Sequence, residues 1–428
     1  MASVSKRTFK RVLSLFSGCG GMDLGFEGGF EVPDLSINSD VNPDWQITIT
    51  RDGWARVGET IFKTVFANDI RPDARTAWVN YFENRGTDGS VYKLGSIVDL
   101  VKKAAVESDV FPDNVDIVTG GFPCQDFSVA GKRLGFNSNK SHNGEKIDVA
   151  DVPTIETRGS LYIWMREVIG LTRPKMFIAE NVKGLVNLGN VKDIIQRDFS
   201  SVCDNGYIVV KPRILHAGNY GVPQSRERVI FFGFLKSALR KEALEALSSD
   251  VIPPEYDPYP TQTHFISESE RFLNPSLKPY VPVGAVLKDL PEPNEAYNDL
   301  SQQSYSKARW MGKHCQGQTE IDWNGLGPTI RAEHHGNIEY RRLSLEHGGK
   351  MVDELNKGLP ERRLTVRECA RIQTFPDDYE FVIKGKHKNN RISASDAYKL
   401  IGNAVPPLLA YHIAKRIEKL WDLYFIGG

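Results

Sequence analysis

The stretch Leu13–Glu27, LSLFSGCGGMDLGFE, decides the fold class. An apolar run at 12–16 leads directly into a glycine-rich turn and then into a helix-like pattern, which predicts strand, turn and helix. Glycine suits this turn because its backbone can take a positive φ and approach a ligand closely. A cofactor with an adenosine end fits such a turn, and Asp69, after the next apolar run, is placed to hold its ribose. A nicotinamide-binding turn and a plain tight turn are the alternatives, because a lone glycine-rich loop is weak evidence.

Short apolar runs alternate with helix-like stretches as far as residue 235. Such alternation predicts an α/β fold, a doubly wound and mostly parallel sheet covered by helices on both faces. Ligands bind such sheets at the carboxyl ends of the strands, where the glycine-rich turn and other turns follow. The further predicted strands are 64–67, 115–119, 176–179 and 229–234, and the clearest helices are 161–171 and 191–202.

The sequence changes character after residue 234. Residues 251–293 are rich in proline and tyrosine, residues 299–350 are polar, and no strand–helix alternation is visible there. We therefore predict a second, smaller, irregular and β-rich domain. Helical character returns with a capping box at Thr365–Glu368 and an amphipathic helix over 404–425. The expected division is 1–235, 236–361 and 362–428, with 33–59 and 137–157 as insertions on loops.

Composition excludes several classes of protein. Lys+Arg and Asp+Glu both number 54, so the net charge is zero, which argues against a polybasic nucleic-acid binder but leaves room for a local basic groove. No apolar run approaches the roughly 20 residues that a membrane helix needs, and the basic start lacks an apolar signal core, so we expect a cytosolic protein. The 5 cysteines include no CxxC pair, which argues against a disulfide framework and a structural zinc site.

The segment Gly120–Gly135, GGFPCQDFSVAGKRLG, carries a candidate nucleophile. Cys124 follows a proline just after a predicted strand, which would hold its thiol at the edge of the ligand crevice. The polar stretch after it could close over a substrate. A buried turn cysteine is the alternative.

Two further predicted strands carry charged side chains at one end. Glu180 ends an apolar strand, where burial would raise its carboxyl pKa and suit it to donate a proton near neutral pH. A structural salt bridge is the alternative. Arg226 and Arg228 lie two apart before the last strand, so both face one side and could clamp a carboxylate, a phosphate or a base edge. An exposed, charged strand start is the alternative for this pair.

Taken in order, these motifs closely resemble those of the DNA cytosine-5 methyltransferase family, of the bacterial restriction–modification type. The resemblance covers residues 11–235 and 362–418, and it leaves out most of the region between them, where the family keeps its variable target-recognition domain. The matching motifs are FSGCGG (16–21), GGFPCQDFS (120–128), ENV (180–182), QSRER (224–228), RRLTVRECARIQTFP (362–376) and IGNAVPP (401–407).

The resemblance implies the S-adenosylmethionine-dependent methyltransferase fold and methyl transfer from that cofactor to C5 of a flipped-out cytosine in DNA. It implies that the Cys124 thiolate adds to C6 of the base and that Glu180 donates a proton or a hydrogen bond to N3. Arg226 and Arg228 would hold the base carbonyl and neighbouring charge, with Arg228 nearer the ring.

The resemblance also implies a set of cofactor contacts. Two departures from the family pattern, Ser14 and Ser96, stand where relatives often carry acids. The implied contacts are Phe16, Ser17, Gly18, Gly20, Gly21, Met22, Asp69, Ile70, Ile97, Pro123, Leu161, Asn403, Ala404 and Val405.

The expected partner is double-stranded DNA, and a restriction endonuclease for the same site is a possible second partner of a monomeric enzyme. An RNA cytosine-5 methyltransferase is the alternative; a silent DNA-binding relative and a nicotinamide oxidoreductase are more distant rivals. The long region 235–361 favours duplex DNA, since relatives that act on RNA tend to have shorter ones. The DNA-contact candidates are Gln125, Ser128, Lys132, Arg133, Gln224, Thr329, Ile330 and Arg331, followed by His334, His335 and Asn337.

Overall fold

The fold is built on a central sheet of 8 strands, seen in a computed structural model that describes residues 9–122, 161–187, 191–203, 205–296, 298–332, 338–385 and 391–427. The strand order is β10-β11-β8-β7-β1-β5-β6, and β9 pairs with β11. The neighbours from β8 to β6 pair in parallel, whereas β11 runs antiparallel to its partners. The strands are β1 (Lys10–Leu15), β5 (Phe62–Asp69), β6 (Tyr92–Leu94), β7 (Ile117–Gly120), β8 (Met176–Val182), β9 (Tyr207–Val209), β10 (Arg213–His216) and β11 (Glu227–Leu235).

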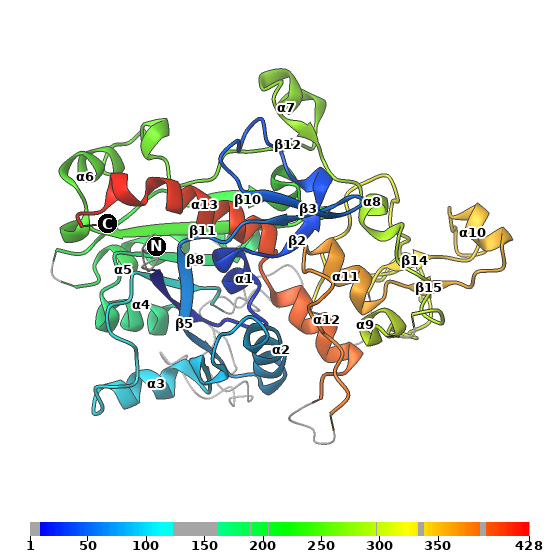
Figure 1. The fold of residues 1–428 in the computed structure, drawn as a ribbon, viewed down its shortest axis with the longest axis horizontal. Coiled ribbons are helices and arrows are strands. Elements are labelled where there is room, and N and C mark those ends of the chain that lie inside the picture. Colours follow the sequence, from blue (N-terminus) through cyan, green and yellow to red (C-terminus); the bar gives the residue numbers. More distant parts are fainter. Residues whose placement is uncertain are drawn as a thin grey trace, which may run out of the picture.

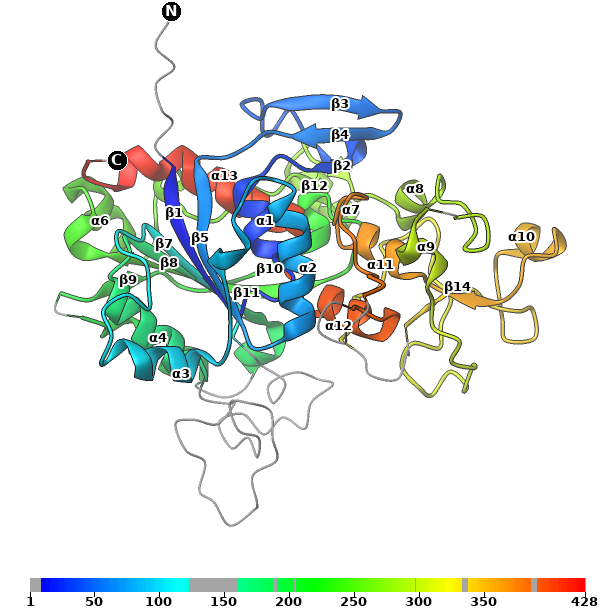
Figure 2. The ribbon, with the colours of Figure 1, turned by 60° about the horizontal axis from the view of Figure 1, so that its bottom comes forward.

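Helices cover both faces of this sheet (Figures 1 and 2). Successive strand residues alternate between two cores: Val12 and Ile178 lie in one, and Leu13 and Phe177 lie in the other. The first core includes α1, α2 and α13, and the second includes α3, α4 and α5. The prediction of a mostly parallel, doubly wound sheet is therefore confirmed. These helices are α1 (Gly21–Glu27), α2 (Pro72–Glu83), α3 (Ile97–Ala104), α4 (Leu161–Thr172), α5 (Val191–Ser200) and α13 (Pro407–Tyr424).

The insertion at 33–59 differs from the expected loop. Residues 31–57 form an antiparallel sheet in the order β2-β4-β3, with β2 (Glu31–Pro33), β3 (Ile47–Arg51) and β4 (Trp54–Val57). The reason is burial, because Val32, Ala55 and Val57 are fully covered and belong to the first core. The other predicted insertion, 137–157, lies outside the described residues.

The region after β11 is irregular, as expected, and carries short helices beside two small sheets. Strand β12 (His264–Phe265) pairs in parallel with β13 (Lys278–Pro279), and β14 (Tyr340–Arg342) pairs antiparallel with β15 (Arg362–Arg363). Its first part lies against the central sheet, since the Tyr259 hydroxyl donates to the Ile230 carbonyl at 2.8 Å. The helices are α6 (Lys241–Leu247), α7 (Glu268–Leu273), α8 (Val283–Leu287), α9 (Leu300–Gln303) and α10 (Val352–Asn356).

The last part of the chain returns to the sheet through α11 (Val366–Ile372), α12 (Ala394–Asn403) and α13. Thr365 and Glu368 form the predicted capping box at the start of α11. Helix α13 packs so closely on α1 that a Cβ atom at Gly25 would lie 2.4 Å from Cβ of Ala410. The C-terminal helix thus packs on the first helix of the chain.

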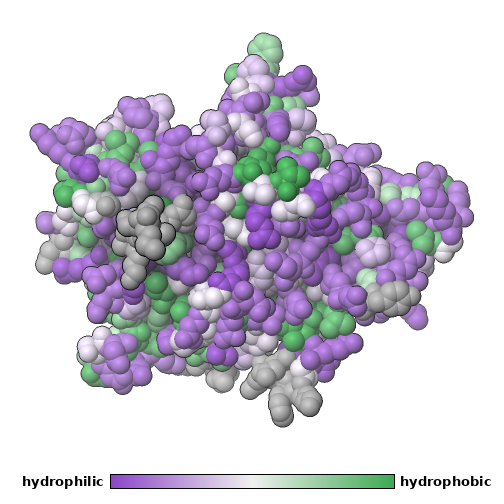
Figure 3. Space-filling view, in the orientation of Figure 1, coloured by the Kyte–Doolittle hydropathy of each residue, from purple (hydrophilic) through white to green (hydrophobic). Residues whose placement is uncertain are grey.

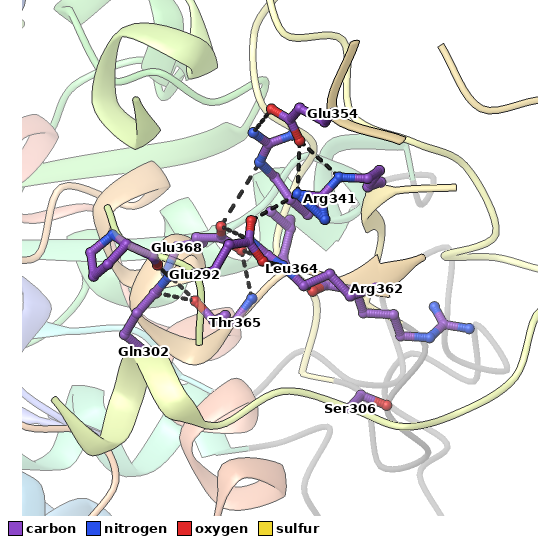
Figure 4. A network of polar contacts seen from close by, with 12 residues as sticks. Glu292, Gln302, Ser306, Arg341, Glu354, Arg362, Leu364, Thr365 and Glu368 are labelled. Atoms are coloured by element: carbon purple, nitrogen blue, oxygen red, sulfur yellow. Dashed lines mark hydrogen bonds and ion pairs between the residues drawn. The ribbon is translucent and has the colours of Figure 1, made fainter. Parts of the chain in front are cut away.

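A buried network of charges joins the second region to α11 (Figure 4). Glu292 contacts both Arg342, at 2.7 Å, and Arg362, at 2.9 Å. Arg362 also donates to Glu368 at 2.8 and 2.9 Å, and Glu354 lies 2.8 Å from Arg342. Since side chains of Arg342 and Arg362 are almost fully covered, each charge depends on these partners. The network fixes the orientation of β14 and β15 against α11.

The surface in Figure 3 is mostly hydrophilic, and its apolar side chains form small separate patches. One of these patches is the projecting tip at α7, where Phe272 and Leu273 are exposed. Among the described residues, no helix has the length and apolarity that a bilayer crossing requires.

Candidate active site at the carboxyl edge of the sheet

The glycine-rich turn after β1 combines close packing with one open position. Phe16, Gly18 and Gly20 take positive φ angles of 53°, 53° and 78°. A Cβ atom at Gly20 would lie 2.6 Å from Cδ1 of Trp78, and one at Gly21 would lie 2.3 Å from the Val405 carbonyl oxygen. These two glycines therefore permit packing of protein on protein. By contrast, no atom of the described residues lies within 4 Å of a Cβ built at Gly18, so this glycine faces open space.

Asp69 supports the same turn from the end of β5. Its two carboxylate oxygens accept hydrogen bonds from the backbone N–H groups of Gly18 and Arg71, each at 3.0 Å. Burial raises the pKa of this carboxyl above its ordinary value, although those N–H groups favour the charged form. Each oxygen keeps a further lone pair, so Asp69 can hold the turn and accept from a hydroxyl as well. The open position and this carboxylate fit the adenosine end of a cofactor.

The remaining predicted cofactor residues surround this turn at different depths. Ile70 and Asn403 are exposed, Phe16 and Ser17 are half-buried, and Val405 lies against Gly21. Met22 is buried in the first core, Ile97 and Leu161 are buried in the second, and Ala404 is half-buried.

The two departures from the family pattern have local structural roles. Ser14 accepts a hydrogen bond from the Ser17 hydroxyl at 2.9 Å. Ser96 is the N-cap residue of α3, where its side chain accepts from Val98 N–H at 3.3 Å. Both serines therefore stabilise the backbone around the turn and the start of α3.

A buried ion pair lies where β8 ends beside the start of β11. Nε of Arg228 contacts Oε1 of Glu180 at 2.6 Å, and both side chains are about one-tenth exposed. Their antiparallel strands pair Ile230 with Glu180 and Arg228 with Val182, so the two side chains share one face. Burial raises the pKa of the Glu180 carboxyl, while the guanidinium groups of Arg228 and Arg226 oppose that shift. A carboxyl whose pKa is raised by burial keeps its proton to a higher pH than an exposed glutamate does, as a proton donor requires.

The chain that leads to Cys124 lies against this pair. A Cβ atom at Gly121 would lie 2.9 Å from Oε2 of Glu180, and the Phe122 carbonyl accepts from the Asn181 side chain at 3.2 Å. Cys124 is two residues further along the chain. The candidates that fall outside the described residues are Pro123, Cys124, Gln125, Ser128, Lys132, Arg133, His334, His335 and Asn337.

Arg226 makes other contacts than Arg228, although only one residue separates them and the charges of both act on Glu180. Its side chain is 1% exposed and donates to the backbone carbonyls of Ile330, Gly402 and Ala404 at 3.2, 2.9 and 2.8 Å. Gln224 is fully buried and donates to Oε1 of Gln373 at 3.0 Å. The two arginines thus have different hydrogen-bond partners, although the charges of both act on Glu180.

The other DNA-contact candidates divide by exposure. Thr329 is half-buried, and its hydroxyl donates to the Ser225 carbonyl. Arg331 pairs with Glu339 at 2.7 Å and stays partly exposed. Ile330 is fully buried in the first core, and so is the side chain of Gln224, so their side chains contact protein. Direct contact with DNA by these two would require the core to open, and we leave both out of the DNA-contact set.

Sequence reasoning missed a basic strip at Lys307–Lys313. Burial alternates along it: Lys307, Arg309, Met311 and Lys313 are exposed, and the residues between them are half-buried. Among the described residues, no acidic side chain forms an ion pair with its three cations. The cations at three of four alternate positions in K-A-R-W-M-G-K were a signal that could have identified it.

Buried contacts hold this strip in place. Arg363 donates to the carbonyls of Ala308 and Gly317 at 2.9 and 2.6 Å. Ser306 N–H donates to the Tyr398 hydroxyl of α12, the helix that ends at Asn403. In Figure 2 the yellow segment around residue 310 lies on the lower side of the molecule, as α12 does. The strip therefore projects its cations from a fixed backbone close to α12.

Known proteins that resemble this chain place it in a family. Residues 10–419 match the family model of the C-5 cytosine-specific DNA methylases. The type II methyltransferase M.BspRI of Lysinibacillus sphaericus is 33% identical over 95% of this chain and 81% of its own length, and M.BsuRI of Bacillus subtilis is 32% identical over 99% and 82%. The solved structure of the S. pombe Dnmt2 methyltransferase shares the fold, with a TM-score of 0.51, 16% identity and coverage of 96% and 99%. The chain therefore belongs to the C-5 cytosine-specific DNA methylase family and is a DNA cytosine-5 methyltransferase of the type II, restriction–modification kind.

Proposed function

We propose that this chain transfers a methyl group from S-adenosylmethionine to C5 of a flipped-out cytosine in a specific sequence of duplex DNA. The observation that carries the proposal is the buried pair of Glu180 and Arg228, next to the segment that leads to Cys124. We assign 1–235 to catalysis and cofactor binding, 236–361 to target recognition, and 362–428 to the return segment.

The glycine-rich turn and its surroundings would hold the cofactor. Gly18 offers close backbone approach, Asp69 offers a carboxylate for the ribose, and Asn403 offers an exposed amide. When bound, S-adenosylmethionine supplies an electrophilic methyl group. The fourteen residues from Phe16 to Val405 that the family resemblance implies stay our proposal for this site, with Gly20 and Gly21 acting through packing.

The protein's own groups would make C5 of cytosine reactive. The Cys124 thiolate would add to C6, and the electron pair displaced from the C5–C6 bond would make C5 nucleophilic. Glu180 would give its proton to N3, which makes C6 more electrophilic, and Arg228 would hold the base carbonyl and orient Glu180. After transfer, loss of the C5 proton and departure of the thiolate would restore the aromatic ring.

This chemistry requires the base to leave the helix. The thiolate and the methyl donor approach opposite faces of the ring, and stacking in duplex DNA covers both faces. We propose that residues 125–135 cover the flipped base and that Thr329, Arg331 and the basic strip contact the duplex. A restriction endonuclease that acts on the same site and a monomeric state also belong to this proposal.

A duplex that contains 5-fluorocytosine tests the covalent step. Fluorine at C5 cannot leave as a proton does, so the adduct between Cys124 and C6 should persist after methyl transfer. We expect mass spectrometry to find a peptide that carries Cys124 linked to the base, and only when S-adenosylmethionine is present. Cys124→Ser should form no adduct, whereas the control Cys203→Ser, a half-buried thiol near α5, should form it fully.

Two results would contradict the proposal. An adduct in Cys124→Ser would place the nucleophile elsewhere. An adduct with fluorinated RNA and none with DNA would favour the RNA cytosine-5 methyltransferase instead.

A further inference from the structure

We infer that Arg226 and Gln373 form a carbonyl clamp, a pair of positioning residues that fixes 401–404 against the glycine-rich turn and against Ile330. The inference rests on the proposed function for its consequences in cofactor and DNA binding. The contacts themselves belong to the described residues. Neither residue would touch the cytosine ring.

The clamp binds three backbone carbonyl oxygens, those of Ile401, Gly402 and Ala404. Gln373, fully buried after α11, donates through Nε2 to the carbonyls of Ile401 and Ala404, at 2.8 and 2.6 Å. Arg226 donates to the carbonyls of Gly402 and Ala404, so Ala404 accepts from both clamp residues. These oxygens belong to the end of α12, where the last carbonyls of a helix lack intrahelical donors. The Ile401 carbonyl also accepts from the Ala404 N–H at 3.1 Å, so the clamp adds a second donor there and supplies donors to the carbonyls of Gly402 and Ala404.

Holding 401–404 also positions the cofactor side of the site. The Val405 carbonyl oxygen would lie 2.3 Å from a Cβ at Gly21, so the return segment and the turn leave no room between them. Asn403, the exposed residue proposed to contact the cofactor, lies between two clamped carbonyls. A shift of this segment would displace Asn403 relative to Gly18 and Asp69.

Arg226 also contacts the segment 329–331, which carries the proposed DNA contacts. Arg226 donates to the carbonyl of Ile330, the residue between the proposed DNA contacts Thr329 and Arg331. Two backbone bonds strengthen this junction: Ser225 N–H donates to the Gly327 carbonyl at 2.8 Å, and Gly327 N–H donates to the Pro223 carbonyl at 3.0 Å. Arg226 thus connects the cofactor side with the DNA side, whereas Gln373 contacts the cofactor side and Gln224.

The inference predicts different effects for the two residues. Gln373→Met removes two donors at similar volume and should raise the dissociation constant of S-adenosylmethionine about tenfold, as loss of two neutral hydrogen bonds would give. It should leave DNA affinity and kcat nearly unchanged. Arg226→Lys keeps the charge but cannot bridge three carbonyls, so it should weaken both cofactor and DNA binding. Because both clamp residues bind Ala404, the double variant should lose less than the sum of the single losses.

Gln302→Met is the matched control. Gln302 is also buried, donates to the Pro291 carbonyl and accepts from Thr365, but it makes no contact with 401–404. Calorimetry should therefore give it the wild-type dissociation constant for S-adenosylmethionine. Amide hydrogen exchange provides a second readout that needs no ligand: Ala404 should exchange faster in Gln373→Met and at the wild-type rate in Gln302→Met.

The two readouts separate this inference from the proposed function. Unchanged exchange at Ala404 and an unchanged cofactor dissociation constant in Gln373→Met would overturn the clamp while wild-type methylation stands. Ala404 could exchange faster in Gln373→Met while the wild-type chain binds no S-adenosylmethionine. That pair of results would contradict the proposed function and support the clamp. A large fall in kcat for Arg226→Lys with unchanged affinities would also overturn the inference, because it would return Arg226 to the reacting base.

Discussion

Burial raises the pKa of the Glu180 carboxyl, which therefore keeps its proton to a higher pH. The nearest described cation is Arg228. We predict that Glu180→Gln lowers kcat by about 10²- to 10⁴-fold, the usual contribution of a positioned general acid. In the wild type, kcat should fall as pH rises through the raised pKa of Glu180, because the carboxylate has no proton to give. The variant should lose this alkaline decline. The measurement is kcat against pH for both proteins.

Glu227→Gln provides the comparison for that experiment. Glu227 lies on β11 beside Arg228, but it is partly exposed and pairs with Lys183. Its variant should keep the wild-type kcat and pH profile. Equal losses in the two variants would show that general charge near β11, and not the proton of Glu180, determines the rate.

Asp23 is a second buried carboxyl, and it affects stability. Burial raises its pKa to about 7, and the Trp78 indole N–H donates to it at 2.7 Å. Its pKa in the unfolded chain is about 4, so the folded state holds a proton that the unfolded state has lost between those values. The free energy of unfolding should therefore fall as pH rises from about 4 to 7, by about 1.4 kcal/mol per unit of pKa difference at most.

Asp23→Asn should remove most of this decline, because the amide oxygen still accepts from Trp78 and carries no charge. Denaturant unfolding at pH 5 and pH 8 measures the effect. The variant should gain stability relative to the wild type at pH 8 and gain little at pH 5. Parallel pH profiles for the two proteins would rule out Asp23 as the cause.

Individual residues show how far sequence reasoning reaches. The family resemblance placed Glu180 and Arg228 around one base, and the structure places them in contact. The two-residue spacing put Arg226 on the same face as Arg228, but it did not reveal that Arg226 binds carbonyls from distant segments. No local pattern reveals such carbonyl partners, since every residue has a carbonyl and the fold alone decides which ones lack a donor.

At the scale of elements, the start of α11 depends on one carboxylate. Glu368 accepts from Thr365 N–H at 2.8 Å and from two nitrogens of Arg362. Glu368→Gln would keep the shape of the side chain but remove one of the carboxylates that neutralise the buried guanidinium of Arg362. We predict a loss of about 2–4 kcal/mol in the free energy of unfolding, measured by denaturant titration. Glu268→Gln, an exposed change at the start of α7, should cost less than about 0.5 kcal/mol.

A loss below about 0.5 kcal/mol in Glu368→Gln would mean that the network contributes no more than surface charges do.

Elements with a strong local signature were predictable. The capping box at α11 was read from Thr365 and Glu368, and the five apolar runs became β1, β5, β7, β8 and β11. The small sheet β2-β4-β3 was missed because polar residues surround its few apolar ones, and its stability depends on packing of Val32 and Val57 against distant helices. Tertiary contacts of this kind outweigh local polarity.

At the scale of the whole molecule, zero net charge conceals local separation of charge. The strip with Lys307, Arg309 and Lys313 presents three cations to solvent, and neutralising the phosphates of DNA would release counterions. We predict that DNA affinity falls steeply with salt, and that changing all three residues to glutamine lowers the slope of log K against log[salt] by about 2–3, at roughly 0.9 per phosphate contact. Fluorescence anisotropy between 50 and 200 mM salt, roughly the range in which such effects are resolved, measures it.

Three lysines at the other end of the molecule, Lys236, Lys241 and Lys419, provide a control of equal charge. Their glutamine variants should keep the wild-type slope. A strip variant with an unchanged slope would mean that DNA contacts lie elsewhere, even if the enzyme methylates DNA normally.

The most direct measurement is transfer of labelled methyl groups from S-adenosylmethionine to unmethylated duplex DNA, with RNA in parallel and with the product mapped by conversion sequencing. We predict label at C5 of cytosines within one short sequence of the duplex, no label in RNA, and none from Cys124→Ser. Label confined to RNA, or full transfer by Cys124→Ser, would contradict the account.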